Sequence, residues 1–314
     1  MPSHLANTVP CGAGLRRKSL IERQAVRVRR SHRAQECGRA IRAHASEEDA
    51  DETAGLPPDA DWREFRARLV VTTMREQEET EAQGAAAWVP RLAKDNQKLL
   101  AEQNPELARE PVWVHPTGAP EVGGLLVATP GASARLGEFS WQTVVLLIRH
   151  DEMGSIGLVL NRPMGLNIGE SRNDPGGLPL DVDGLTPSQR RAFADNRVYC
   201  GGLRGQQAMH FLHGHGDLEG SLEIVPGVYI GGLSAAAQDV VDGKKRASDF
   251  RFICGMMSWD VGQLNAEVEA GCWITAACSR PLIIKQCLTL PTPLWREVLG
   301  LMGGEYAQIA EGEL

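Results

Sequence analysis

Thr143–Arg149 reads TVVLLIR, and two similar runs flank it: GLLVAT at Gly124–Thr129 and SIGLVL at Ser155–Leu160. Each run is short, rich in β-branched and apolar side chains, and bounded by Gly, Pro, Asp or Asn, which is the pattern of β-strands. The middle run is apolar enough that we expect both of its faces to be buried. The turn-forming stretch His150–Gly154 separates the second and third runs, so the sequence predicts a hairpin there.

Further strands and helices extend outward from this centre. We expect strands at Val198–Tyr199, Gln207–Leu212, Leu222–Val225, Arg251–Cys254 and Cys272–Thr275. We expect helices from Thr186-Pro187 to Asp195, at Ser234–Asp242, at Asp260–Ala270 and at Leu294–Met302, with Ser234 and Asp260 as N-caps. Because the elements alternate without a regular βαβ rhythm, the sequence predicts an α+β fold, with helices packed on mixed or antiparallel sheets.

The regions outside this core are polar. Residues 165–184 predict a Gly-rich loop, and residues 307–314 a C-terminal tail. Residues 46–120 contain 8 basic and 16 acidic side chains and predict an acidic linker and helical extension. Within that extension we expect a helix capped by Asp61, a second helix at Pro90–Gln103 and a linker at Pro111–Pro120.

The N-terminal 45 residues have the opposite charge. They contain ten Lys or Arg against two Glu, whereas the rest of the chain has a net charge of −15. A basic leader poor in acids, before an acidic body, is typical of a transit peptide, so we expect residues 1–45 to direct the protein to the chloroplast stroma or, as the alternative, to a mitochondrion. A retained basic arm that binds nucleic acid is the other interpretation. No run of 18 apolar residues predicts a membrane span.

Several motifs fall together in the order and spacing of one family. They are GLLVAT (124–129), TVVLLIRHDE (143–152), GLVLNRP (157–163), VYCGG (198–202), and GQL (262–264) followed by Glu267. Residues 121–306 therefore resemble the AlgH/YqgE family, and AACS (276–279) and LWREVLGLMGG (294–304) resemble its plant branch. The resemblance implies a compact α+β domain with coiled, partly bifurcated sheets and a regulatory role, without a catalytic mechanism. The chain departs from the family pattern at Gly255–Trp259, which reads GMMSW.

Asn161 and Arg162 end an apolar strand, where packing can hold a guanidinium in place while its planar fork of N–H donors binds a phosphate or carboxylate, with Asn161 as a second donor. Alternatively, Asn161 makes a turn with Pro163, and Arg162 pairs with an internal carboxylate such as Glu267.

Cys200-Gly201-Gly202 offers a nucleophile beside backbone N–H groups that glycines allow to converge on an oxyanion. No particular His accompanies this cysteine in the sequence, and the two glycines are also typical of a bulge or tight turn. No two of the five cysteines beyond the leader form a C-x-x-C motif. Their number and spacing therefore predict neither a disulfide framework nor a zinc module.

Trp259, Gln263 and Glu267 form a further candidate, because Gln263 and Glu267 lie four residues apart on one helix face. A helix capped by Asp260 and packed on Trp259 is the structural interpretation, and a face that binds a partner is the functional one.

His210, His213 and His215 lie within six residues and offer either a metal-binding face or a solvated loop. We expect the loop, no metal and no cofactor.

Residues 121–314 have a net charge of −7 and one short basic cluster, Lys244–Arg246, so direct DNA binding is disfavoured. The sequence therefore favours a non-enzymatic plastid binding or regulatory domain. It would recognise a protein partner or a small anionic ligand through Asn161, Arg162, Cys200–Gly202, Trp259, Gln263 and Glu267. A thiol enzyme or hydrolase using Cys200 and a nucleic-acid-associated regulator are the alternatives.

Overall fold

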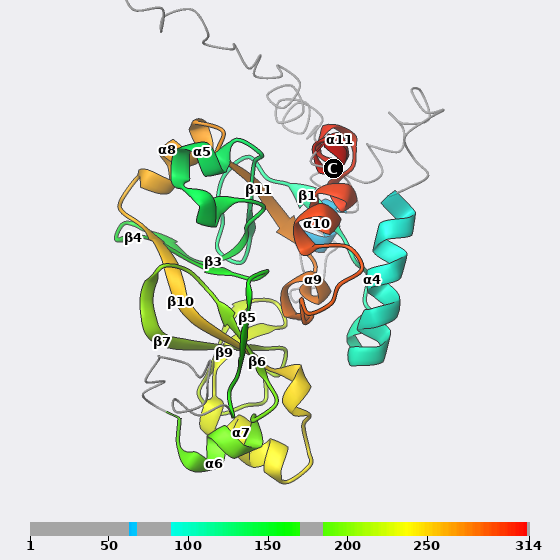
Figure 1. Ribbon diagram of the computed structural model, residues 1–314, viewed down its shortest axis with the longest axis vertical. Helices are drawn as coiled ribbons and strands as arrows, with labels where there is room; N and C mark the ends of the chain where they lie inside the picture. Colours follow the sequence, from blue (N-terminus) through cyan, green and yellow to red (C-terminus); the bar gives the residue numbers. More distant parts are fainter. Residues whose placement is uncertain (1–62, 68–88, 170–184, 313–314) are drawn as a thin grey trace, which may run out of the picture. The chain divides into compact units, whose positions relative to one another are not determined.

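The computed structural model describes residues 63–67, 89–169 and 185–312 (Figure 1). All of them belong to one compact unit, Asp59–Leu314. The expected transit peptide, the expected N-cap at Asp61 and most of the expected loop at 165–184 lie outside the described residues. Among the described helices, none is long and apolar enough to cross a bilayer.

The described strands form a branched, mixed sheet. They are β1 (Val114–Pro116), β2 (Leu125–Ala128), β3 (Val144–Asp151), β4 (Gly154–Val159), β5 (Pro163–Asn167), β6 (Arg197–Cys200), β7 (Arg204–His213), β8 (Ser221–Val225), β9 (Val228–Gly231), β10 (Arg251–Trp259) and β11 (Trp273–Cys278). Their order is β1-β11-β2-β3-β4-β10-β7-β9-β8, with β5 paired to β6 and β6 to β10. The β6–β10 pair is parallel and the others are antiparallel.

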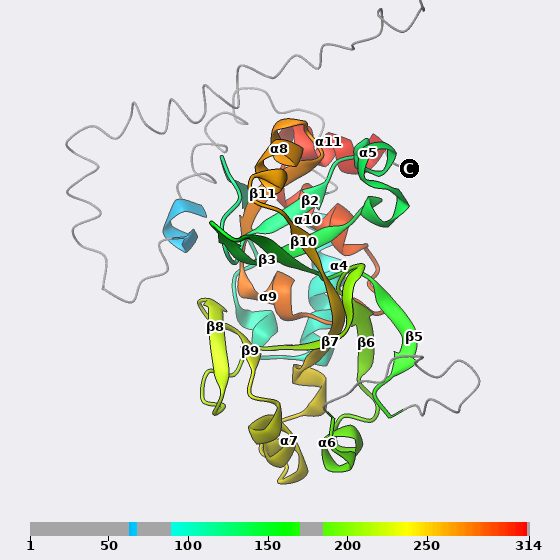
Figure 2. The same ribbon diagram turned by 90° about the vertical axis from the view of Figure 1, so that its left-hand side faces the viewer.

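The branch point lies in β10, which runs through both parts of the sheet (Figures 1 and 2). Its first residues pair with β6 and β7, and its last three pair with β4. The register with β7 shifts between Cys254 and Met256, and Gly255 between them has a φ of 75°, a conformation that glycine adopts without strain. One bulge therefore lets a single strand serve two sheets, which confirms the expected α+β fold with mixed sheets.

The three apolar runs at Gly124–Thr129, Thr143–Arg149 and Ser155–Leu160 form adjacent strands. β2 pairs with β3, and β3 pairs with β4 down to Asp151 opposite Gly154, so the predicted hairpin closes through Glu152 and Met153 alone. Val144–Leu147 are fully buried, as expected for a strand covered on both faces.

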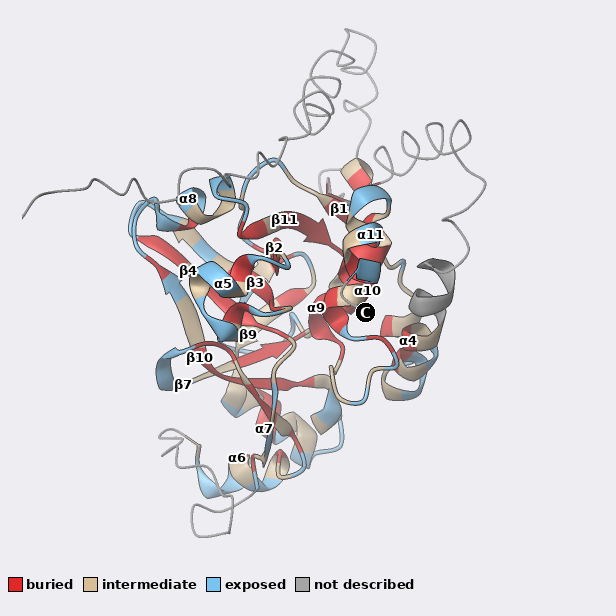
Figure 3. Ribbon diagram, turned by 45° about the horizontal axis from the view of Figure 1, so that its top comes forward, coloured by how far each residue is buried: buried red, intermediate tan, exposed pale blue. Residues whose placement is uncertain are grey.

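Helices cover the sheet on several sides, and the buried residues run through the strands beneath them (Figure 3). The helices are α4 (Val89–Gln103), α5 (Ala132–Leu136), α6 (Pro187–Ala192), α7 (Leu233–Val241), α8 (Gln263–Glu269), α9 (Arg280–Ile284), α10 (Leu294–Met302) and α11 (Gly304–Gly312). Short 3-10 turns lie at Leu107–Arg109, Glu138–Ser140 and Ala247–Asp249. One apolar core lies under α10, a second around four phenylalanines near α6 and α7, and a third between α8 and the β2–β4 strands.

Three strands differ from the expectation. β1 lies within the expected linker at 111–120, β5 overlaps the expected loop at 165–184, and β9 was not expected. The prolines around β1 favoured a linker, but β1 lies at the edge of the described sheet, next to β11, and an edge strand tolerates proline.

Two helix starts also differ. α8 begins at Gln263 rather than Asp260, because Gly262 with a φ of 75° is its N-cap and the Gln263 side chain instead accepts from the Asp260 N–H at 3.0 Å. α7 is capped by Gly232 rather than Ser234, whose hydroxyl accepts from the Gln189 side chain on α6. Residues 307–312, expected in a tail, form the second part of α11, and Ala310 lies in the main core.

The helix expected at Pro90–Gln103 is confirmed as α4, and it is bonded into the core. The Asn96 amide donates to the Thr292 carbonyl at 2.9 Å and to Glu297 Oε2 at 2.5 Å, and it accepts from the Thr292 N–H at 3.0 Å. Glu297 also pairs with Lys285, and both side chains are almost completely buried. A charged network in the interior thus joins α4 to α10 and to the loop before it.

Candidate functional site

The residues singled out from the sequence separate into two groups. Trp259, Gln263 and Glu267 line one cavity, together with Leu203 and Arg204, which directly follow Gly202. Asn161, Arg162 and Cys200 do not line that cavity. Asn161 and Arg162 follow the end of β4, and the Arg162 carbonyl accepts from the N–H of Cys200 at the end of β6.

The Asn161 side chain bonds to the backbone of the residues at the start of β3. Its side-chain oxygen accepts from the Val144 N–H at 3.1 Å, and its amide donates to the Gln142 carbonyl at 2.8 Å. Gln142 has a φ of 48°, unusual for a residue with a side chain, so Asn161 stabilises a tight turn. This contact is local and structural, although it differs from the expected turn with Pro163.

Arg162 bonds to the same turn. Its guanidinium donates to the Trp141 carbonyl and to the Thr143 hydroxyl, the latter at 3.1 Å, so its alternative partner is not Glu267. Burial lowers the pKa of Arg162 below its ordinary value, and the nearby Cys200 thiol partly opposes that shift. The guanidinium is therefore half-buried and already engaged by the protein.

Backbone carbonyls accept from two of the N–H groups that an oxyanion at Cys200 would use. The Cys200 N–H donates to the Arg162 carbonyl at 2.8 Å, and the Gly201 N–H donates to the Cys254 carbonyl at 2.7 Å. The Cys200 thiol lies 3.7 Å from the Gly202 carbonyl oxygen. A Cβ on Gly201 or Gly202 would come closer than 3.0 Å to the backbone of β10, so the glycines serve a close crossing of β6 over the Gly255 bulge.

Glu267 is the centre of the second group. Its Oε2 accepts from the indole N–H groups of Trp259 and Trp273, both at 2.8 Å, and its Oε1 accepts from the Gln263 amide at 2.9 Å. The two indole rings meet edge to face with centroids 6.1 Å apart. Gln263 and Glu267 share one helix face, as the i, i+4 spacing predicts.

The cavity beside Glu267 has a volume of about 240 Å³. Apolar side chains form most of its wall: Leu136, Phe139, Leu203, Met256, Met257 and Trp259. Leu203 at its rim is 62% exposed. Two further exposed apolar side chains are close to lining residues in the sequence. Trp141 directly follows Ser140, and Val261 precedes Gln263 by two positions. An exposed apolar rim around a small pocket is typical of a surface that binds another molecule.

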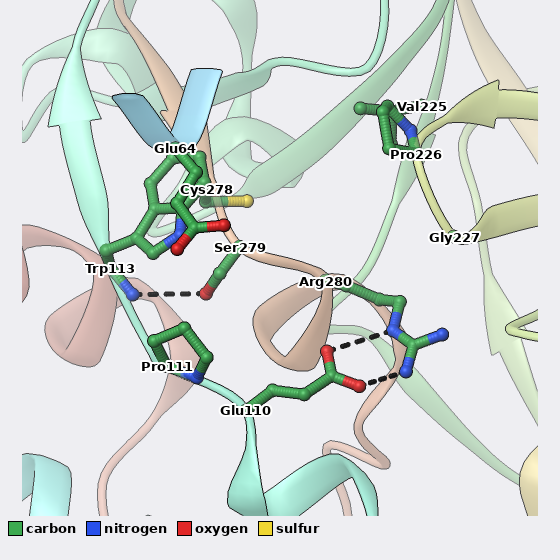
Figure 4. Close-up of a pocket in the computed structure, with 10 residues that line it drawn as sticks. All are labelled: Glu64, Glu110, Pro111, Trp113, Val225, Pro226, Gly227, Cys278, Ser279 and Arg280. Atoms are coloured by element: carbon green, nitrogen blue, oxygen red, sulfur yellow. Dashed lines mark hydrogen bonds and ion pairs between the residues drawn. The ribbon is translucent and has the colours of Figure 1, made fainter. Parts of the chain in front are cut away.

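A second cavity of about 350 Å³ lies where the β8–β9 turn faces residues 110–113 and the start of α9 (Figure 4). The Arg280 guanidinium forms two bonds to the Glu110 carboxylate across it. Burial raises the pKa of the Cys278 thiol at its base to about 12, so this thiol stays protonated. The Arg280–Glu110 pair thus engages the one cation among the lining residues that the structure describes, and Glu64 adds a second carboxylate to the lining.

The three histidines do not meet in a metal site. His213 is fully buried: its Nε2 donates to the Gly231 carbonyl at 3.0 Å and its Nδ1 accepts from the His215 N–H at 3.2 Å. His215 Nε2 lies 3.7 Å from an Asp249 oxygen. Within the described ranges, no three His, Cys, Asp or Glu side chains are placed to share a metal ion. The expected solvated loop is wrong for His213, which is a core residue in β7.

A model of the AlgH-like family matches residues 125–307. The chain belongs to the AlgH-like family. Its relatives include the UPF0301 protein of Pelodictyon phaeoclathratiforme, 34% identical over 182 residues that cover 57% of this chain and 87% of the relative. Similar structures include protein DIP2367 of Corynebacterium diphtheriae, with a TM-score of 0.46 and 20% identity over 62% of this chain and 93% of that one. The AlgH protein of Pseudomonas aeruginosa has a TM-score of 0.39 and 24% identity over 54% and 85%.

The AlgH-like match begins at β2, so α4 and β1 precede it. Both are nevertheless bonded to matched elements: β1 pairs with β11, and Asn96 of α4 bonds to Glu297 of α10. The folded unit of this AlgH-like chain is therefore longer than the family-matched segment.

Sequence reasoning missed two groups of side chains in this AlgH-like domain. Trp273 completes the Glu267 cluster from β11, and Arg251 is a fully buried cation on β10. Trp273 is the second residue of the strand expected at Cys272–Thr275, and no spacing in the sequence links it to Trp259. For Arg251, the available signal was a charged residue at the start of an apolar strand.

A prediction about pH follows from His213. Burial lowers its pKa to about 4, below the value of about 6.5 for an unfolded chain, so as pH falls the unfolded state binds the proton first. The contribution of His213 to the free energy of unfolding is expected to be constant above pH 7 and to fall by about 3 kcal/mol between pH 6.5 and 4. Urea unfolding at a series of pH values measures this. His213→Phe should flatten that part of the profile, and an unchanged slope in the variant would assign the loss to other groups.

Proposed function

We propose that this AlgH-like protein is a non-enzymatic binding domain of the plastid, and that the cavity beside Glu267 receives an apolar side chain of a protein partner. The observation that carries the proposal is the small apolar cavity lined by Trp259, with the exposed Leu203 at its rim.

The size and lining of the cavity favour a protein partner. Its volume of about 240 Å³ lies below the range of roughly 300–1,000 Å³ typical of small-molecule sites. Met256 and Met257 contribute flexible thioether side chains, which adapt to the shape of an inserted group. One or two anchoring side chains of another protein fit these dimensions.

The Glu267 carboxylate at the cavity favours a partner that brings a hydrogen-bond donor. Glu267 Oε2 accepts from two indoles, whereas Oε1 accepts from Gln263. A carboxylate oxygen has two lone pairs, so Oε1 has the capacity to accept from one more donor. Arg204 also lines the cavity, so the cavity wall carries one cation as well as this carboxylate. A backbone N–H, a hydroxyl or a basic group beside the apolar anchor suits the site.

The alternatives receive less support from the described residues. A thiol enzyme at Cys200 receives less support because the N–H groups of Cys200 and Gly201 are bonded to backbone carbonyls. For a nucleic-acid regulator, the basic cluster is already paired: Lys244 with Asp239 and Asp242, Lys245 with Asp217 and Asp239, and Arg246 with Asp249. The basic leader at residues 1–45 supports the plastid as the compartment.

The experiment compares two exposed leucines in plant cells. The full chain with a C-terminal affinity tag is expressed, plastids are isolated, and the mature tagged protein is recovered with its partners. Leu203→Asp places a charge at the cavity rim, whereas Leu222→Asp is its control, because Leu222 is 63% exposed on β8 and does not line the cavity.

We expect the tagged protein in the plastid fraction, shortened by the leader, and partner recovery reduced at least about tenfold by Leu203→Asp. Leu222→Asp should recover as much partner as the unaltered chain. Equal recovery with both variants would contradict the binding role of the cavity, and a full-length protein outside plastids would contradict the compartment.

A further inference from the structure

Arg251 is a cation in the centre of the protein. Its side chain is fully buried at the start of β10. One guanidinium nitrogen donates to the Ile283 carbonyl at 2.7 Å, and another donates to the Leu160 carbonyl at 2.5 Å. The guanidinium carbon lies 4.4 Å from the centre of the Tyr199 ring. Arg251 Nε is buried without a hydrogen-bond partner.

This cation has no carboxylate partner among the residues that the structure describes. Removing an ion from water costs several kcal/mol, and carbonyl groups and a ring face recover only part of that. A buried guanidinium with an unbonded Nε therefore calls for a neighbouring negative charge.

Two groups beside Arg251 can acquire a negative charge, and they are Tyr199 and Cys287. Burial raises the pKa of Tyr199, which outweighs the opposing effect of Arg251, so the phenol stays neutral. Its hydroxyl donates to Gln286 and accepts from the Cys287 N–H, both at 3.0 Å. The nearby Lys285 side chain is paired with Glu297 and contributes no free charge. Cys287 is the remaining group.

The Cys287 thiol contacts the Arg251 guanidinium and, at 3.8 Å, the Lys285 carbonyl oxygen. Its sulfur lies 3.9 Å from a guanidinium nitrogen of Arg251, and the residue is half-buried in the loop between α9 and α10. A cation next to a thiol stabilises the thiolate, which is the reactive form. We propose that Cys287 is a redox-active cysteine that the adjacent Arg251 guanidinium activates and that hydroperoxides oxidise.

The chemistry is a two-electron oxidation. The thiolate attacks the terminal oxygen of a hydroperoxide, an S–O bond forms and the O–O bond breaks. Sulfur is oxidised to a sulfenic acid, and the departing alkoxide takes a proton from water to become an alcohol. A small thiol then condenses with the sulfenic acid, which forms a mixed disulfide and releases water. A second molecule of that thiol restores Cys287 by exchange.

The test measures the alkylation rate of each cysteine in the full chain at pH 7. Iodoacetamide labelling is followed by peptide mass spectrometry, and each rate is divided by the rate of the same thiol in urea-unfolded protein. Cys287 is expected to react at least about tenfold faster than Cys200, the other half-buried thiol. Substoichiometric hydrogen peroxide followed by dimedone should label Cys287 first, and Cys287→Ser should remove that label.

Arg251→Met removes the proposed source of reactivity. In a folded variant, checked by circular dichroism, the normalised rate at Cys287 should fall about tenfold. The matched control is Arg162→Met, which removes the cation beside Cys200 and should leave Cys287 unchanged. An unchanged Cys287 rate in folded Arg251→Met overturns the proposal. A Cys287 rate in the unaltered chain no greater than that of Cys200 overturns it as well, whether or not the variant folds.

Discussion

Replacing Glu297 with Gln is expected to destabilise the protein by about 3–5 kcal/mol, because it leaves the Lys285 ammonium buried without its counter-charge. Both residues are 4% exposed, and Glu297 Oε2 also accepts from the Asn96 amide. The free energy of unfolding from urea titration, followed by circular dichroism, measures the loss. The effect should be large because a single oxygen joins α4, α10 and the loop that precedes α10.

Two controls separate the loss of a charge partner from the loss of packing. The double variant Lys285→Met, Glu297→Leu removes both charges and should be much more stable than Glu297→Gln, within about 1–2 kcal/mol of the unaltered chain. Lys98→Met breaks the exposed pair with Asp95 and should cost less than about 0.5 kcal/mol. A Glu297→Gln variant no less stable than Lys98→Met would contradict the interpretation.

Gly202→Ala is expected to cost about 3 kcal/mol or more, or to prevent folding. A Cβ at this position would lie closer than 3.0 Å to backbone atoms of Met256 and Met257, and backbone in a paired strand cannot move aside as a flexible side chain does. The same titration provides the measurement, and soluble yield provides a second readout when the variant does not fold.

Gly165→Ala is the matched control in β5. A Cβ there meets no atom within 4 Å, so the substitution should change stability by less than about 0.5 kcal/mol. Similar costs for the two variants would mean that the crossing of β6 over β10 is looser than the structure indicates.

The central strands could be predicted because their signals are local. Val144–Leu147 are apolar without interruption and are bounded by turn residues, so composition alone identified a strand buried on both faces. β1 could not be identified in this way, because its three residues form a strand only through pairing with β11, far along the chain. The start of α8 was predicted wrongly because two local signals compete there. Asp260 is a good N-cap residue, but Gly262, two positions later, forms the cap.

The candidate site could be predicted only where its residues share one element. Gln263 and Glu267 were joined by helical spacing, and both contribute to the cavity. Arg162 and Trp259 were expected on the same surface, yet they belong to separate groups, because the fold brings Arg162 to the turn at Trp141 instead. The contact between Arg251 and Cys287 joins residues from two distant elements, and no spacing in the sequence reports such a pair.

The pairing of β1 with β11 has a consequence for how the chain avoids aggregation. β11 is an almost entirely buried strand of six residues, and β1 covers one of its edges. A fragment limited to the family-matched segment would present that apolar edge to solvent, where unpaired N–H and carbonyl groups recruit strands from other molecules. We therefore expect Val114–Pro116, which pairs with Ala276–Cys278, to protect that part of the edge from pairing between molecules.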